Sequence, residues 1–495
     1  MLSIVIFLPV AVGIVLALLP RLSPSAARWT WLLTTVVDLA LIVAVSVAGP
    51  TGDNGLVAEE QLAWMPGVGT SYHIGIDGFS IPLMLLTGVI FVASALWSMR
   101  VDDRPRAQAA LFLFLQTTCL GVFAAQDLIL FFLWFDLSIV GMYFVIAGWG
   151  HGDARRSALK FFLYTFLGSL ALLLGFIGLY LHSAPHTFDM VELSQAGAFT
   201  GDALAGGLIL VAVVIGLAIK TPTFPFHSWL PPAHTDAPSI GSVVLAAVML
   251  KMGTYGFVRI AMPMLPDAWR AGAWIIVAVG IVSVLYGALV ALAQTDIKRM
   301  IAFTSINHMG YVILAVGAAG ILAPDSEQAQ QLALTGATIQ MVSHGLITGA
   351  LFLLAGVFWE RTGNYDLREY GGLASRAPRF AGFFAVAAFA SLGLPGFSGF
   401  IAEFQIFTGS IGSTMWAALA LPGILIVAVL FLRTFQRVFT GGEAGLTPDF
   451  ADLRRHESVP LVLLLGLAVV IGIVPGPLIE IVAPAAEQLL GLLSP

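Results

Sequence analysis

Long runs of hydrophobic residues, separated by short polar segments, follow one another along the whole chain. A helix needs about 20 apolar residues to cross the hydrocarbon core of a bilayer, and about fourteen runs reach that length. The runs are too long and too uniformly apolar for the strands of a membrane barrel, so helices must satisfy the backbone polar groups in lipid. The pattern predicts an all-α polytopic membrane protein. The predicted spans are residues 2–20, 29–49, 75–99, 107–124, 127–149, 157–181, 205–229, 237–261, 271–293, 300–322, 331–357, 379–408, 412–439 and 458–479.

The two ends of the chain carry their own signals. The first run, Leu2 to Leu19, has no basic residue before it and is followed by Arg21. A cleaved signal peptide carries its positive charge in front of the apolar run, so we expect an uncleaved first helix. After the last span, residues 479–495 contain Pro484 and are expected to form a short interfacial tail.

Helix-breaking residues interrupt the seventh and the twelfth spans. The seventh contains TPTFP at residues 221–225, and the twelfth contains PGFSG at 395–399. Proline removes a backbone donor and glycine loosens the helix, and broken helices at membrane depth usually line an ion site or a hydrated cavity. A shift of five spans superposes spans four to eight on spans nine to thirteen, and an odd shift makes the two repeats inverted.

The predicted organisation therefore has four parts within one membrane domain. Helices 1–3 occupy residues 1–106, and the first five-helix repeat, helices 4–8, occupies residues 107–262. The second, inverted repeat, helices 9–13, occupies residues 270–440. Helix 14 and the tail occupy residues 441–495.

Composition supports a membrane protein and narrows its chemistry. Hydrophobic residues make up 59% of the chain and charged residues 10%, against about 25% charged in soluble domains. The net charge of −6 gives no basic face, so we expect no nucleic-acid partner. The single cysteine, Cys119, excludes iron–sulfur ligation within this chain, so any redox chemistry belongs to other subunits.

The distribution of basic residues predicts the orientation in the membrane. All but four of the 22 Lys and Arg residues fall in alternate predicted loops, the first, third, fifth, ninth, eleventh and thirteenth. Arg259 and Arg270 lie on the opposite side, and Lys220 and Lys251 lie inside predicted spans. Loops rich in Lys and Arg face the cytoplasm, so both termini are expected on the non-cytoplasmic side.

Asp136, Lys220, Lys251 and Glu403 are charged residues that lie inside predicted spans. An ionised side chain at the bilayer centre costs about 2.5–3.5 kcal/mol on insertion scales, so it persists only with a partner, water or a function. The alternative is a set of ion pairs that only holds helices together. Burial lowers the proton affinity of an amine and a nearby carboxylate raises it, so a lysine and an acid can together take up and release a proton.

Two histidines lie in apolar spans near polar neighbours. His308 and His344 are flanked by serines and threonines that could support water chains, and a neutral histidine can relay protons. A packed, hydrogen-bonded histidine is the alternative for each. His227 and His234 are typical of a structured turn at the membrane edge, and their spacing matches no metal motif.

Four stretches carry a resemblance to a known family. They are AIKTPTFPFHSWLPPAHTDAPSIGSVVLAAVMLKMGTYGFVR, GIDGFSIPL, DIKRMIAFTSINHMGYV and IQMVSHGLITGALFLLAG. The chain resembles the antiporter-like subunits of respiratory complex I from about residue 70 to 440. The resemblance implies a non-redox, proton-translocating subunit of a NADH:quinone oxidoreductase, with FMN, iron–sulfur clusters and quinone in partner subunits. It also implies a bacterial plasma membrane and L-type and N-type neighbours.

The residue after the twelfth-span break sorts the members of this family. L-type, N-type and Mrp antiporter subunits generally have lysine there, whereas the M type, the counterpart of mitochondrial subunit 4, has glutamate. Glu403 makes this chain resemble the M type. By motif, Lys220 is the central lysine, Lys251 the connecting lysine, and Glu403 the terminal proton-exchange site.

The resemblance also assigns His308 and His344 to the relay between the connecting lysine and the terminal site. One residue departs from the family pattern: Asp136 stands where the family has glutamate. Its side chain is one methylene shorter, so it needs a water to reach Lys220, or a closer approach of the helices.

Two other functions stay open at this stage. One is a subunit of an Mrp-type sodium/proton antiporter or of a complex related to membrane-bound hydrogenase, against which Glu403 argues. The other is a purely structural membrane scaffold, against which the four buried charges argue.

Overall fold

The computed structural model describes residues 1–19, 21–52, 54–100, 103–195, 202–323 and 326–493. In this part, thirteen helices are long and apolar enough to cross a membrane. Twelve of them match predicted spans, and the thirteenth, Gly476–Leu493, follows the last predicted span. The first predicted span holds a helix of 17 residues, and the twelfth is interrupted. The predicted last residue of the first span, residue 20, and the last two of the tail, 494–495, lie outside the described residues.

The α-helices are α1 (Leu2–Leu18), α2 (Pro24–Ala48), α3 (Ser80–Trp97), α4 (Pro105–Ala124), α5 (Leu128–Trp149), α6 (Ala154–His182), α7 (Met190–Gln195), α8 (Ala203–Lys220), α9 (Leu230–Asp236), α10 (Ser239–Val244), α11 (Leu250–Gly256), α12 (Met262–Met264), α13 (Pro266–Leu292), α14 (Ile297–Ala318), α15 (Glu327–Thr362), α16 (Leu373–Arg376), α17 (Pro378–Ser391), α18 (Ser398–Ser413), α19 (Pro422–Phe439), α20 (Arg455–Ile473) and α21 (Gly476–Leu493). The strands are β1 (Val57–Met65), β2 (Thr70–Ile76), β3 (Tyr370–Gly371) and β4 (Ala444–Gly445). Two π-helical segments are η3 (Leu245–Met249) and η4 (Phe257–Ala261), and the 3₁₀ turns are η1 (Pro66–Val68), η2 (Ser98–Arg100), η5 (Leu367–Glu369), η6 (Met415–Ala420) and η7 (Thr447–Asp449).

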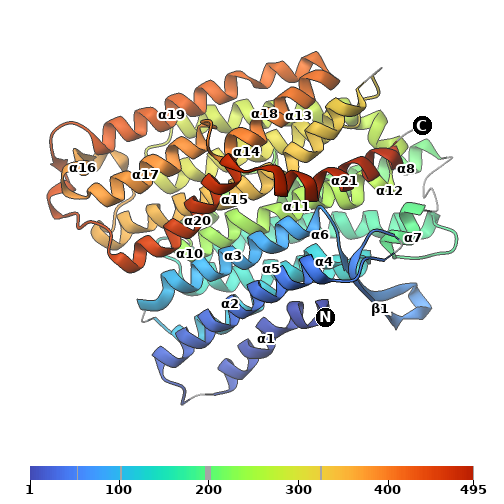
Figure 1. Ribbon diagram of the computed structural model, residues 1–495, viewed down its shortest axis with the longest axis horizontal. Helices are drawn as coiled ribbons and strands as arrows, with labels where there is room; N and C mark the ends of the chain where they lie inside the picture. Colours follow the sequence, from blue (N-terminus) through green and yellow to red (C-terminus); the bar gives the residue numbers. More distant parts are fainter. Residues whose placement is uncertain (20, 53, 101–102, 196–201, 324–325, 494–495) are drawn as a thin grey trace.

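The long helices lie side by side and are stacked in chain order (Figure 1). Helices α1 and α2 lie at one edge and α19 at the other, while α20 and α21 return across the middle. Helix α15, with 36 residues, is about 54 Å long and packs against α14, α18, α20 and α21. It is the central element of the bundle.

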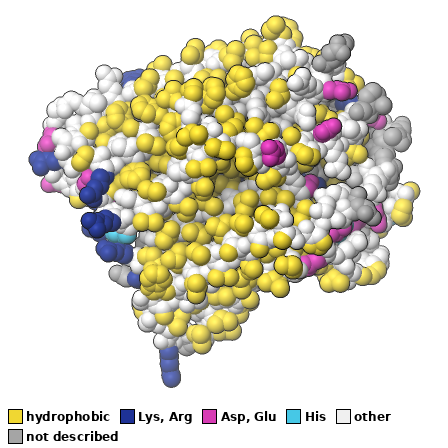
Figure 2. All heavy atoms as spheres, in the orientation of Figure 1, with side chains coloured by type: hydrophobic (Ala, Val, Ile, Leu, Met, Phe, Trp, Pro, Cys, Tyr) yellow, Lys and Arg dark blue, Asp and Glu magenta, His cyan; other side chains and the backbone are white. Residues whose placement is uncertain are grey.

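Charge is separated between the two ends of the bundle. Figure 2 shows Lys and Arg gathered at one end, with some Asp and Glu among them, further Asp and Glu toward the other end, and a broad hydrophobic surface between them. We call these the basic end and the acidic end. Both termini lie toward the acidic end (Figure 1).

Both predicted helix breaks are present. Helix α8 ends at Lys220, and the chain turns through residues 221–229 before α9 begins. The twelfth span is divided into α17, which ends at Ser391, and α18, which begins at Ser398. The predicted break within residues 205–229 is confirmed: the helix ends at Lys220, just before Pro222 and Pro225. The inverted relation of the two repeats stays a prediction.

The eighth span contains two π-helical segments, which the hydropathy pattern did not predict. Segments η3 and η4 lie on either side of α11, the short helix that carries Lys251. π-helical turns are rare and often occur at functional sites, because they free a carbonyl and re-aim side chains.

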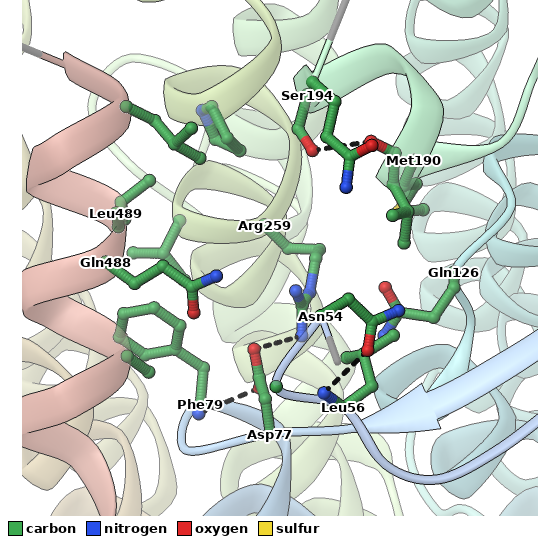
Figure 3. A pocket seen from close by; sticks show the side chains of 17 residues that line it. Asn54, Leu56, Asp77, Phe79, Gln126, Met190, Ser194, Arg259, Gln488 and Leu489 are labelled. Atoms are coloured by element: carbon green, nitrogen blue, oxygen red, sulfur yellow. Dashed lines mark hydrogen bonds and ion pairs between the residues drawn. The ribbon is translucent and has the colours of Figure 1, made fainter. Parts of the chain in front are cut away.

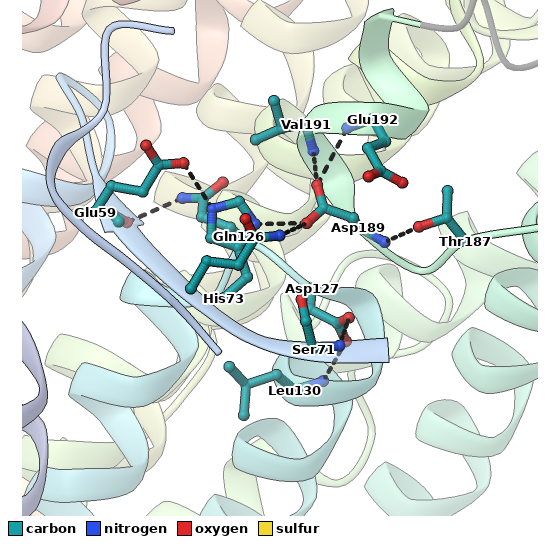
Figure 4. Close-up of polar contacts among 12 residues, drawn as sticks. Glu59, Ser71, His73, Gln126, Asp127, Leu130, Thr187, Asp189, Val191 and Glu192 are labelled. Carbon is teal, nitrogen blue, oxygen red and sulfur yellow. Dashed lines mark hydrogen bonds and ion pairs between the residues drawn. The ribbon is translucent and has the colours of Figure 1, made fainter. Parts of the chain in front are cut away.

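A β-hairpin lies at the acidic end, in the segment that follows the second predicted span. Strands β1 and β2 pair in antiparallel register, and His73 of β2 lies between two carboxylates (Figure 4). Its Nδ1 is 2.6 Å from Asp189 and its Nε2 is 2.7 Å from Glu59. Asp127, which caps α5, accepts a hydrogen bond from Thr70 at 2.8 Å. These contacts anchor the hairpin to the residues that precede α5 and α7.

The segment after the last predicted span is a helix rather than a short tail. Helix α21 has 18 residues and enough apolar character to count among the candidate spans. It packs against α15, α12, α13 and α3 toward the acidic end. The sequence predicted only a short tail because a proline, Pro484, interrupts this segment. The helix continues through that proline.

Candidate functional site

Lys220, the last residue of α8, points into the bundle. It is 1% exposed, and its Nζ donates a hydrogen bond of 3.2 Å to the Ser138 hydroxyl on α5. The same Nζ lies 4.6 Å from the centre of the Phe135 ring. The amine is thus held at the end of a broken helix by a hydroxyl and an aromatic face.

Asp136 lies near Lys220 without forming an ion pair with it. Among the described residues, no carboxylate oxygen lies within 4.0 Å of the Lys220 amine. Asp136 is half-buried, lies beside Ser169 of α6, and interacts with Lys220 through its charge. Its Oδ1 is buried and has no hydrogen-bond partner in the described structure. The helices have therefore not closed the gap left by the shorter side chain.

Lys251 and His344 are in direct contact at the centre of the bundle. Lys251 is 0% exposed, and its Nζ donates to the Ala246 carbonyl of η3 at 2.6 Å. The Nζ also lies 2.7 Å from His344 Nδ1 on α15. An ammonium can only donate, so we assign His344 Nδ1 as the acceptor and its Nε2 as the protonated nitrogen. The π-helical carbonyl and the histidine together fix the lysine.

His308 and Glu403 continue from His344. The His308 and His344 rings lie 5.4 Å apart between centroids, and His308 Nε2 lies 3.9 Å from Glu403 Oε1. Glu403, on α18, is 7% exposed. These three residues line a cavity of about 10 Å³ that also includes Gln340 and Ser343, which is close to the smallest space that holds one water molecule. The four residues from Lys251 to Glu403 form a contiguous buried row.

The two parts of the site meet where α8 and α11 touch. The Ser138 hydroxyl that binds Lys220 also lies 3.5 Å from the sulfur of Met252, the residue after Lys251. Gly253 packs against Thr221 so closely that a Cβ there would collide with the threonine hydroxyl. The break in α8 is therefore pressed against the helix that carries Lys251.

Arg259 and Asp77 form a separate, paired cluster at the acidic end. They lie 2.7 Å apart at a cavity of about 500 Å³, which Gln126 and Gln488 also line (Figure 3). Burial alone would raise the pKa of Asp77, but Arg259 and hydrogen bonds from Ser80 and Phe79 lower it. This ion pair explains the polar residues of the GIDGFSIPL stretch, which tie α3 to η4.

Two residues were misplaced by the sequence reasoning. Lys298 was assigned to a loop, but it is the second residue of α14 and is 0% exposed. His234 was assigned to a membrane-edge turn, but it is 0% exposed in α9 and neither ring nitrogen has a hydrogen-bond partner among the described residues. His227 does lie in the turn, where its Nε2 is 3.1 Å from the Tyr286 hydroxyl. Hydropathy could not reveal the burial, because folded loops cover these residues.

Broken helices, buried lysines and an acid in one bundle define a class: an antiporter-like membrane subunit. Residues 125–429 match the family model described as NADH:quinone oxidoreductase/Mrp antiporter. NADH-quinone oxidoreductase subunit M of Rhodobacter capsulatus is 35% identical, over 99% of this chain and 96% of the relative. Subunit M of Rickettsia prowazekii is 34% identical, over 99% and 98%. The chain belongs to the subunit M family of NADH-quinone oxidoreductases.

Solved structures agree with this assignment. A chain of respiratory complex I from Thermus thermophilus aligns over 100% of both chains with a TM-score of 0.89 and 29% identity. A chain of the Mrp complex from a Dietzia species aligns with a TM-score of 0.84 and 21% identity, over 100% of this chain and 99% of that one. At that identity the Mrp likeness shows a shared fold only.

Proposed function

We propose that this chain moves protons through the membrane arm of a NADH:quinone oxidoreductase, along the buried row from Lys251 to Glu403 and with Lys220 as a further proton carrier at the break in α8. The observation that supports this best is the unbroken series of neighbours Lys251, His344, His308 and Glu403. Each can exchange a proton, and all four are buried in the part of the chain that the structure describes. Buried ionisable groups in a membrane protein usually mark a proton or ion path.

The first transfer in the row takes place across the contact between Lys251 and His344. The ammonium of Lys251 passes a proton to His344 Nδ1 over 2.7 Å. The imidazole then carries protons on both nitrogens and releases one from Nε2. This nitrogen has no hydrogen-bond partner among the described residues, and His344 lines the small cavity, where a single water would receive the proton.

The second transfer delivers the proton to Glu403. Both His308 and Glu403 line the same cavity, and their closest nitrogen and oxygen lie 3.9 Å apart. This distance is too long for a direct hydrogen bond and suits a bridging water. Glu403 then holds the proton at the break between α17 and α18, where the terminal exchange takes place.

Lys220 and Asp136 form the switchable part of the site. Their charges interact without a direct ion pair, so a water between them would complete the contact. When Asp136 is ionised, it favours the ammonium form of Lys220; when Asp136 is neutralised, the lysine releases its proton more readily. A change in the protonation of Lys220 and Asp136 would alter the proton affinity of the row. In this way the pair would couple the row to the neighbouring subunits.

The redox cofactors and the other membrane-arm subunits belong to other chains of the complex. We assign the FMN, iron–sulfur clusters and quinone to partner subunits, and L-type and N-type subunits to the two flanks of this one. The membrane is the bacterial plasma membrane, with both termini on the non-cytoplasmic side, because the basic end of the bundle carries the Lys and Arg residues.

The test is proton translocation by the assembled complex in inverted membrane vesicles. Lys220→Ala and Glu403→Gln are expected to leave the complex assembled and to abolish the proton translocation carried by this chain. Asp136→Asn should behave in the same way, whereas Asp136→Glu should keep translocation because it retains the charge. Glu327→Gln, at an exposed position of α15, is the matched control. Normal translocation by assembled Glu403→Gln, or translocation that requires sodium, would contradict the proposal.

A further inference from the structure

A lysine outside the row is buried at the basic end of the bundle. Lys298 lies in the first turn of α14, is 0% exposed, and donates one hydrogen bond of 2.6 Å to the Ala237 carbonyl. Within the described residues no carboxylate oxygen lies within 4.0 Å of its amine. A lysine near a helix end normally extends its amine to water. Here the fold covers the amine instead.

Aromatic and histidine side chains form the cover over Lys298. The Tyr365 ring lies 5.0 Å from the Lys298 amine, and the Tyr365 hydroxyl is 3.0 Å from His151 Nε2. His151 Nδ1 in turn lies 3.0 Å from the Asp236 carbonyl, and Trp359 packs against both rings. The cover is therefore built from groups that can hold or pass a proton.

Above this cover lies an acidic cavity. Its volume is about 320 Å³, and it is lined by His151, Asp236, Asp296, Tyr365 and Asp366 among others. Asp296 and Asp236 both act on Lys298 through their charges. Carboxylates at an open cavity raise the local concentration of cations, protons included. Tyr365, which lines the cavity, also contacts the Lys298 amine, so protons in the cavity lie on the far side of this one residue from the amine.

Lys298 is joined to the short helix that carries His234. Lys298 binds the carbonyl of Ala237, which closes the short helix α9 that carries His234 one turn earlier. The His234 ring stacks on Phe352 of α15 at 4.5 Å, and neither of its nitrogens has a hydrogen-bond partner among the described side chains. His234 interacts electrostatically with both Lys298 and Lys251. The charges of the lysine at the basic end and of the lysine in the row therefore both act on the same buried ring.

We propose that Lys298 is the proton-uptake amine of this chain, which takes protons from the acidic cavity and passes them through His234 to the pair Lys251–His344. This inference rests on the proposed function, because it supplies the row with its protons. A hydronium ion in the cavity donates a proton to the neutral amine of Lys298: one N–H bond forms as one O–H bond breaks, and a neutral water is left. The ammonium then gives a proton to His234 through water, and His234 gives one to Lys251, so each carrier returns to its starting form.

A purely structural role for Lys298 would need only its positive charge, its hydrogen bond to Ala237 and its position beneath Tyr365. Arginine can supply all three, since its guanidinium is a donor that stacks on aromatic rings. Arginine does not release its proton in proteins. Replacement by arginine therefore separates a positioning role from a proton-carrying role.

The experiment compares Lys298→Arg and Lys298→Met with Lys251→Met in the assembled complex, as protons translocated per electron in inverted vesicles. We expect both Lys298 variants to fall to the level of Lys251→Met, because all three interrupt the same path. His234→Gln, at a ring with no hydrogen bond to lose, should fall to the same level. Arg299→Gln, at the exposed neighbouring residue, should match the wild type.

Two outcomes separate this inference from the proposed function. If Lys251→Met loses translocation and Lys298→Arg keeps the wild-type ratio, Lys298 only positions α9 and the inference is overturned. If Lys251→Met itself keeps the wild-type ratio, the proposed function fails as well. Should Lys298→Met fail to assemble, Lys298→Arg and His234→Gln decide the question in the same assay.

Discussion

At the scale of single residues, the position of Glu403 depends on a glycine across the helix break. Gly393 lies in the loop between α17 and α18 with a φ of +69°, a conformation that costs other residues about 1–2 kcal/mol. A Cβ added at Gly393 would collide with the Glu403 carboxylate. The glycine is therefore needed for the backbone and for the space that the acid occupies.

Gly393→Ala is expected to displace Glu403 from the cavity that it shares with His308. Proton translocation per electron should fall as far as in Glu403→Gln, together with a loss of stability of about 1–2 kcal/mol from the strained φ. The measurements are vesicle translocation and the midpoint of thermal inactivation of the complex.

Gly396→Ala is the matched control for this prediction. Gly396 lies in the same loop with a φ of +96°, and no atom lies within 4 Å of an added Cβ. Alanine at this position should lower stability through its backbone alone and should leave translocation unchanged. Equal loss of translocation in both variants would show that loop strain, rather than crowding of Glu403, is responsible.

The sequence identified those buried residues that carry a charge within an otherwise apolar run. Lys220, Lys251 and Glu403 stand out because each interrupts an apolar run, and all three are buried in the structure. The burial of Lys298 and His234 was not predicted because both lie in polar segments, where exposure is the ordinary expectation. Their burial comes from the tertiary packing of α9 and of the loop that carries Tyr365.

At the scale of elements, local chemistry predicted the helix breaks but not the π-helical segments. Pro222 and Pro225 stop a helix by removing donors, wherever the helix lies. Segments η3 and η4 contain no proline until Pro263 follows, so their geometry depends on partners from elsewhere. One such partner is the pair of Asp77 and Tyr255, which binds Arg259 of η4.

The hairpin β1–β2 shows an element that is held by ionisable groups outside the membrane. Burial lowers the pKa of His73, but its hydrogen bonds and the charges of Asp189 and Glu59 raise it further, so the net pKa lies above the ordinary value. A group with a raised folded pKa contributes stability that is fully present below its unfolded pKa, about 6.5 for histidine. This stability is lost as the pH rises through the folded pKa.

We therefore expect the hairpin to loosen as the pH increases above about 6.5, because neutral His73 no longer binds two carboxylates. Hydrogen exchange of residues 57–65 should accelerate over this range, measured after correction for the intrinsic pH dependence of exchange. His73→Gln should show fast exchange at every pH. The control is His186→Gln, at an exposed histidine bonded to the Tyr180 carbonyl, which should keep the wild-type profile. A flat wild-type profile would contradict the role given to His73.

At the scale of the whole molecule, the row lies inside a bundle whose two ends differ in charge. Lys and Arg gather at one end, with some Asp and Glu among them, and further Asp and Glu lie toward the other end (Figure 2), and the long α15 carries His344 in the middle. The acidic cavity with Asp296 and Asp366 lies near the basic end, whereas the Arg259–Asp77 cavity lies near the acidic end. Orientation therefore decides which cavity faces the compartment that supplies protons.

Single cysteines at two unobstructed glycines are expected to reveal this orientation. Gly67, in the turn of the hairpin, and Gly442, between α19 and β4, are exposed and have no atom within 4 Å of an added Cβ. The only native cysteine, Cys119, is buried and should stay unlabelled. Because an odd number of spans separates the two glycines, they must lie on opposite sides of the membrane. A membrane-impermeant thiol reagent should label Gly67→Cys in intact cells and Gly442→Cys only in inverted vesicles. The reverse pattern would place the acidic cavity outside the cell and would remove the source of protons proposed for Lys298.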